Sequence, residues 1–105
     1  MSSKPPKRFL QFLDDYPDVG KAYRALGSAT KDAGPLDDRT AALVKLGIAI
    51  GMRHEGAVHA HTRKALSAGA SSDEIRHAAL LATTTLGFPN MMAALSWAED
   101  VLSGD

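Results

Sequence analysis

The chain is 105 residues long, with 45% hydrophobic and 23% charged residues, which is the composition of one folded domain and not of a disordered chain. Lys and Arg number 12, and Asp and Glu also number 12. The formal net charge of +0 therefore lacks the basic excess of a general nucleic-acid or membrane-surface binder. The absence of cysteine excludes disulfides, thiolate metal sites and any mechanism with a cysteine nucleophile.

The N-terminal segment and the longest apolar stretch of the chain indicate whether the protein is secreted or membrane-bound. Residues 1–8 are predicted to form a flexible tail, and residues 9–105 a single domain. No long apolar run follows the charged N-terminus, so no secretory signal is expected. The longest nearly apolar stretch, Ala41 to Met52, has 12 residues, whereas about 20 are needed to span a bilayer. We therefore expect a cytoplasmic protein with neither a membrane nor a nucleic acid as its partner.

Two helices are predicted in the first third of the chain. The first contains the apolar residues from Phe9 onward and stops at Tyr16, because a residue before proline is kept out of the α region. Pro17 suits the first turn of a second helix, in which apolar residues recur at steps of three and four. Gly34 and Pro35 are expected to end it.

The next helix is predicted to begin at an N-cap formed by Asp37 or Asp38. Apolar residues occupy nearly every side of it: Leu43, Val44, Leu46, Ile48, Ala49 and Ile50. A helix that is apolar all round is a buried one, and the rest of so short a chain cannot cover it. The pattern therefore predicts burial between the subunits of a homo-oligomer. Gly47 and Gly51 predict a close contact with another helix.

Three further helices complete the predicted fold. One runs from Glu55 to Ala68 and is closed by Gly69. The next is opened by a capping box, with Ser71 as the cap, and continues to Leu86. The last runs from 91 to 102, after a break that contains a proline. No strand-like alternation competes with this pattern, so the fold class is all-α with about six helices.

Four histidines are the first candidates for chemistry, and three of them lie within eight residues. On a helix, His59 and His61 point roughly 200° apart, because each residue advances about 100°. His54 and His61 share a face, but they lie roughly 10.5 Å apart along the axis. Neither pair can hold one ion, so no metal site is predicted within the chain. A metal site would need His77 or an adjacent subunit.

His61 has the more informative surroundings. Its neighbours on the same helix face are all small and apolar: Ala57, Val58, Ala65 and Ala68. This face is predicted to pack inward and to leave room beside the imidazole. The ring is then either a core histidine bonded to a carbonyl or a general acid/base in a small pocket. The opposite side, with Glu55 and His59 four residues apart, is predicted to face solvent and to form a surface pair.

The stretch from His61 to Ile75 resembles the core signature of the carboxymuconolactone decarboxylase and alkylhydroperoxidase D-like superfamily. The signature is a histidine, an alanine four residues later, a glycine, a cap and an acidic residue followed by isoleucine. The segment Leu86–Pro89 is similar to the family's Gly-x-Pro turn, and Leu36–Thr40 to the start of its central helix. The resemblance covers roughly residues 36 to 102. It implies an all-helical fold assembled as a homotrimer or homohexamer.

The redox branch of this superfamily carries a C-x-x-C pair upstream of the histidine. Here His54 and Ala57 stand at those two positions, and the glutamate that relays protons in that branch falls near Ala42. Without sulfur, a thiol peroxidase or disulfide reductase is excluded. The decarboxylase branch needs neither cysteine nor cofactor, and its chemistry is proton transfer on a lactone acid. The resemblance therefore implies no cofactor.

The resemblance leaves two histidines as candidates for the catalytic acid/base. The run from His54 to His59 is similar to a His-Glu-x-Ala-x-His run of the decarboxylase branch, but in a register two residues away from that of His61. The downstream motif favours His61 over His59. Arg53 or Arg39 would hold a substrate carboxylate, since guanidinium binds carboxylate bidentately, and His54 is a further substrate-binding candidate.

Three hypotheses follow from these residues. The first is a cofactor-independent, decarboxylase-like lyase acting on a small carboxylated lactone or a related substrate. The second, of nearly equal rank, is a non-catalytic or small-ligand-binding helical oligomer that has lost the redox chemistry. The third, ranked well behind, is a metal protein that combines histidines from adjacent subunits.

Overall fold

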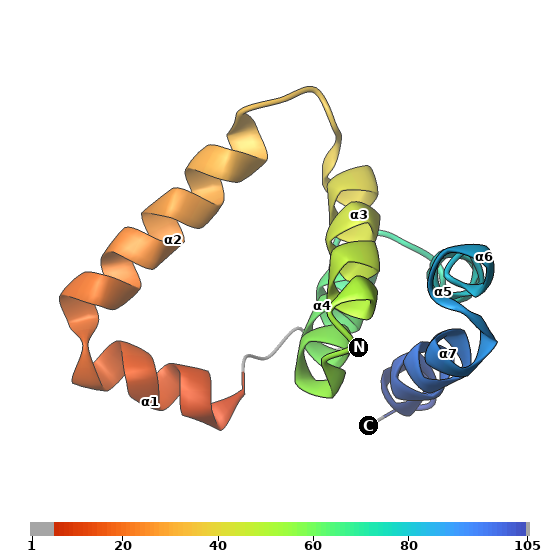
Figure 1. Cartoon of the computed structure of the whole chain (residues 1–105). Helices are drawn as coiled ribbons and strands as arrows, with labels where there is room; N and C mark the ends of the chain where they lie inside the picture. Colours follow the sequence, from red (N-terminus) through yellow and green to blue (C-terminus); the bar gives the residue numbers. More distant parts are fainter. Residues whose placement is uncertain (1–5, 105) are drawn as a thin grey trace.

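The computed structural model describes residues 6–104, and these form helices and connecting turns with no strand (Figure 1). The all-α class is confirmed. The helices of this part of the chain are α1 (Lys7–Asp15), α2 (Pro17–Asp32), α3 (Asp38–Gly51), α4 (Glu55–Ser67), α5 (Ser72–Leu80), α6 (Thr83–Leu86) and α7 (Phe88–Leu102).

These helices form two regions. The arm, α1 and α2, is a pair of helices that pack mainly against each other and extend to one side of the molecule (Figure 1). The body, α3 to α7, holds the core. Within the body, α4 packs against both α3 and α7, and α5 packs against α7.

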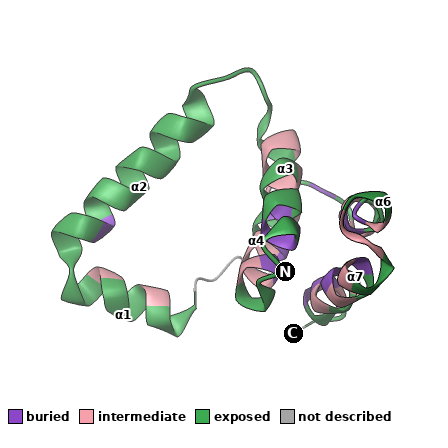
Figure 2. Ribbon diagram, viewed as in Figure 1, coloured by how far each residue is buried: buried purple, intermediate pink, exposed green. Residues whose placement is uncertain are grey.

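The arm is arranged around the Tyr16–Pro17 junction, as predicted. Helix α1 ends before Tyr16, and Pro17 occupies the first turn of α2. Only Gly20 is buried in these two helices, beneath Leu13 of α1 (Figure 2). Of the predicted tail, residues 1–5 lie outside the described residues, whereas Lys7 already belongs to α1.

The body is built on small and branched apolar side chains. The largest fully buried ones are Leu46, Ile75, Val58 and Val101, joined by the hydroxyl-bearing Thr62. The Thr62 hydroxyl donates to the carbonyl of Val58 at 2.7 Å, so its burial leaves no donor without a partner. Buried residues are concentrated on the facing sides of the body helices (Figure 2).

The predicted caps are present at the starts of the body helices. Asp37, and not Asp38, caps α3 by accepting a hydrogen bond from the Thr40 amide at 2.8 Å. At α5 the Ser71 hydroxyl accepts from the Glu74 amide at 3.0 Å, and the Glu74 carboxylate accepts from the Ser71 amide at 2.9 Å. Two of the orphan amides of that helix end are thereby satisfied.

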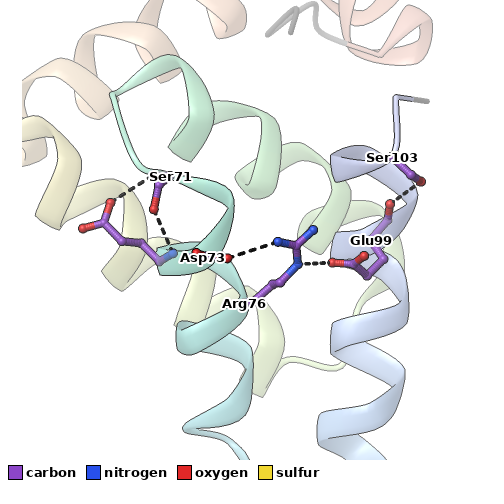
Figure 3. A network of polar contacts seen from close by, with 6 residues as sticks. Ser71, Asp73, Arg76, Glu99 and Ser103 are labelled. Atoms are coloured by element: carbon purple, nitrogen blue, oxygen red, sulfur yellow. Dashed lines mark hydrogen bonds and ion pairs between the residues drawn. The ribbon is translucent and has the colours of Figure 1, made fainter.

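One polar network attaches α5 to α7. The Arg76 guanidinium donates to Glu99 of α7 at 2.6 Å and to Asp73 at 3.3 Å (Figure 3). The capping box at Ser71 lies at the start of the same helix (Figure 3). The register of α5 on α7 is therefore set by a charged contact as well as by core packing.

The single helix predicted from Ser72 to Leu86 is wrong, because the structure divides it into α5 and α6. The break has no glycine or proline. The Thr83 hydroxyl donates to the Leu80 carbonyl at 2.6 Å, and the Ala82 amide donates to the carbonyl only three residues back. Side-chain competition of this kind interrupts the regular helical ladder.

The all-round apolar helix α3 is only half covered by its own chain. Leu46 and Ile50 are buried, whereas Val44 and Ile48 are 47% and 60% exposed. The predicted close helix contact at Gly47 is absent among the described residues, since a Cβ there would meet open space. In the described part of the chain, every helix is too short or too polar to cross a membrane.

Candidate active site around His61

A cavity of about 800 Å³ lies between the arm and the body, bounded by α2, α3 and α4. Its size falls in the range of small-molecule sites, roughly 300–1,000 Å³. Much of its wall is small or apolar, with Leu36, Ala41, Ala42, Val44 and Ala68 among the lining residues. On the side of α2 it is lined by Gly27, Thr30 and Lys31, and by Gly34 just beyond the helix.

His61 lies on the wall of this cavity, as the small residues on its helix face predicted. Val58 and Ala65, on the same face of α4, are fully buried in the core. The imidazole is half-buried. Partial burial lowers the pKa of His61, and the positive charges of Lys64 and Lys45 lower it further. At neutral pH the ring is therefore neutral and able to accept a proton.

Three lysines share the cavity with His61. Lys45 comes from α3, Lys64 from α4 and Lys31 from the end of α2. Lys31 forms an ion pair with Asp38 at 3.4 Å. Among the described residues, Lys45 and Lys64 have no ion-pair partner. Two uncompensated ammonium groups beside a neutral imidazole make this cavity suited to a small anion.

The other predicted substrate-binding residues lie outside the cavity lining. Arg39 forms an ion pair with Glu74, which joins the start of α3 to α5. Arg53 is exposed in the turn between α3 and α4, in the left-handed region at φ 55°. His54 caps α4, its Nδ1 accepting a hydrogen bond from the Ala57 amide at 3.0 Å.

His59 lies in a different place from His61. Its Nε2 is 3.0 Å from a carboxylate oxygen of Asp100 on α7 and 4.0 Å from one of Glu55 on α4. The predicted proximity of Glu55 and His59 is confirmed. The structure therefore separates the two candidate acid/base histidines and brings only His61 to the cavity.

The two free lysines are the site residues that sequence reasoning missed. Lys45 interrupts an otherwise apolar stretch of α3, and this interruption is the signal that could have found it. Lys64 carries no comparable signal, because a lysine near the end of a helix is ordinary. Only the packing of α3 against α4 brings the two ammonium groups to one cavity.

Comparison with known proteins identifies a family, and a relative whose function is not characterized. The sequence profile of the carboxymuconolactone decarboxylase family matches residues 17–100. An uncharacterized protein of Haemophilus influenzae is 39% identical over 64 residues. The match spans 61% of this chain and 57% of that protein, so the chain covers little more than half of its relative. No solved structure matches the chain.

Proposed function

Because the chain belongs to the carboxymuconolactone decarboxylase family, we propose that it is a cofactor-independent lyase acting on a small carboxylated lactone or a related substrate. The observation that supports this proposal best is the placement of His61. It is the one histidine on the cavity wall among the described residues, and it shares that wall with Lys45 and Lys64. The cavity is therefore an acid/base site with two cations beside it.

The residues divide the chemistry between them. Lys45 and Lys64 hold the substrate carboxylate as point charges, a role that Arg39 and Arg53 cannot take from outside the cavity. His61 moves the proton. As carbon dioxide leaves, the electron pair of the broken C–C bond passes into the conjugated lactone, and the dienolate so formed takes up a proton from His61 at a ring carbon. A bound anion raises the pKa of the imidazole, so the ring gains the proton that it then donates.

The test is decarboxylation of carboxylated lactones by the wild-type chain and by His61→Gln. Loss of general acid/base catalysis lowers rates by roughly 10²–10⁴-fold, and we expect a decrease in that range. His77→Gln is the matched control, since His77 is exposed on α5 and does not line the cavity. Equal rates for wild type and His61→Gln would remove His61 from the mechanism.

A specific observation favours a second function, the binding of a small anion without turnover. Ala42, which falls near the proton-relaying glutamate of the redox branch, lines the cavity and cannot relay a proton. In this case carboxylated aromatics and lactones raise the thermal stability of the chain but are recovered unchanged. A ligand present at 100 times its Kd stabilises by about 2.7 kcal/mol, which a melting experiment detects readily.

We also propose that the chain assembles with copies of itself into a trimer or hexamer. The arm exposes Val19, Tyr23 and Leu26, and α3 exposes Ile48, all by more than half of their surface. Sedimentation velocity over a range of concentrations tests this. We expect Ile48→Asp to shift the assembly toward monomer, whereas Thr84→Asp on the exposed turn of α6 leaves it intact. A strict monomer at high concentration would contradict the proposal.

A further inference from the structure

Three potential metal ligands converge on the side of α4 away from the cavity. Glu55 and His59 lie one helical turn apart on α4, and Asp100 reaches them from α7. One ligand atom from each lies within 4.8 Å of the other two. Sequence reasoning found no metal site in the chain because it weighed histidines against one another, whereas the two partners of His59 here are carboxylates.

Two carboxylates approach the same ring nitrogen. His59 Nε2 is 3.0 Å from Asp100 and 4.0 Å from Glu55. That nitrogen carries at most one proton, so it can donate to one carboxylate only. A divalent cation satisfies all three groups at once, because it accepts the nitrogen lone pair and neutralises both negative charges.

The distances suit a first-row divalent ion. Ligand bonds of about 2.0–2.2 Å in a tetrahedral arrangement place ligand atoms roughly 3.3 Å apart. The atoms of His59 and Asp100 already have nearly this spacing. Glu55 lies 4.0 Å from the ring nitrogen and within 4.8 Å of the Asp100 ligand atom, so it needs to move by up to about 1.5 Å. The Glu55 side chain is 60% exposed, so nothing in the core resists that movement.

The fold fixes the relative position of the two helices that carry the ligands. Helices α4 and α7 pack against each other, and Val58 on α4 and Val101 on α7 are fully buried. His59 itself is only 22% exposed, which limits the orientations of its ring. The two helices and the His59 ring are therefore positioned without a bound ion.

We propose that Glu55, His59 and Asp100 form a binding site for a divalent transition-metal ion of the Zn²⁺ type within a single chain. Three protein ligands leave at least one coordination position for water. The ion joins α4 to α7, and so stabilises the helix that carries His61. It lies away from the cavity and takes no part in the chemistry proposed there. This site differs from one shared between subunits, because all its ligands belong to one chain.

The experiment is a calorimetric titration of Zn²⁺ into the untagged, chelator-treated full chain. We expect one ion per chain and a rise in melting temperature on binding. His59→Ala is expected to weaken binding at least about 100-fold, the upper end of losses for outer-shell partners. Asp100→Asn, a nearly isosteric change at an exposed side chain, is expected to weaken it at least about 10-fold. His77→Ala is the control and retains wild-type binding.

Less than one ion per chain at saturation would overturn the proposal, as would unchanged affinity in Asp100→Asn or loss of binding in His77→Ala. Far-UV circular dichroism of each metal-free variant checks that it is folded, and Asp100→Asn keeps the test available should His59→Ala unfold. A stoichiometry that falls when the protein is diluted to monomer would indicate a site between subunits and would also overturn it.

Discussion

The arm carries large apolar side chains, as the body does, yet Gly20 is the only one of its helical residues that is buried. The body buries Leu46, Val58, Ile75 and Val101 completely. Its helices α3, α4 and α5 each begin with a side-chain cap, whereas neither α1 nor α2 has one. The body is thus stabilised within one chain, whereas the apolar face of the arm lacks a partner among the described residues.

Core substitutions give the sharpest test of this difference. Ile75→Ala is expected to lower the free energy of unfolding by about 2–5 kcal/mol, because it leaves a cavity in a fully packed core. Leu26→Ala, at a side chain that is 61% exposed, is expected to cost less than about 0.5 kcal/mol in dilute monomer. Urea unfolding at several protein concentrations measures both.

The concentration dependence decides what covers the arm. The cost of Ile75→Ala should not change with protein concentration, whereas that of Leu26→Ala should grow as the chains assemble. A large cost of Leu26→Ala in the monomer would mean that the arm folds back onto its own body, and the division into two regions would fail.

The second difference between the regions is that helices of the body have side-chain caps and those of the arm do not. A cap substitution tests this difference, with a smaller expected effect. Ser71→Ala removes the hydroxyl that accepts from the Glu74 amide, and such changes cost about 1 kcal/mol. The measurement is again urea unfolding. Ser28→Ala, in the uncapped α2 of the arm, is the matched control and should change the stability little. Equal losses in the two variants would show that the cap contributes nothing specific to the body.

How much of this structure can be predicted from the sequence depends on how far apart along the chain the interacting residues lie. The boundaries at Pro17, Asp37 and Ser71 were predictable because caps and prolines act within three or four residues. The split at Ala82 was not, since no glycine or proline marks it and the Thr83 hydroxyl competes for a nearby carbonyl.

The same distinction of range applies to the candidate site. The position of His61 on a small-residue face could be read from the spacing along α4. Its two lysine neighbours depend partly on the packing of α3 against α4, and Asp100 lies 41 residues from His59. The two lysines at the cavity and the three proposed metal ligands on the other side of α4 are therefore brought together by tertiary structure. The pattern of a single helix cannot predict them.

The half-burial of His61 makes the stability of the body depend on pH. Its pKa is lowered in the folded chain, so the unfolded chain, with a value near 6.5, binds the proton more readily. The free energy of unfolding should therefore be unaffected by His61 above pH 6.5 and should fall as the pH decreases below it. In His61→Gln this contribution is absent, so its stability should decrease less between pH 7.5 and pH 5.5 (about one unit either side of that value). Identical pH profiles would show that the ring is solvated.

The smallest expected effect is a change in the pKa of His61, which distinguishes the lysines that the body and the arm contribute to the cavity. Lys64 of the body lowers the pKa of His61, whereas Lys31 of the arm, paired with Asp38, is not among the causes of that shift. Lys64→Met should therefore raise the pKa of His61, and Lys31→Met should leave it unchanged, as followed by the NMR shift of its Cε1 proton against pH. If Lys31→Met raised the pKa instead, the arm would have to close over the imidazole in solution, and the cavity would then belong to both regions equally.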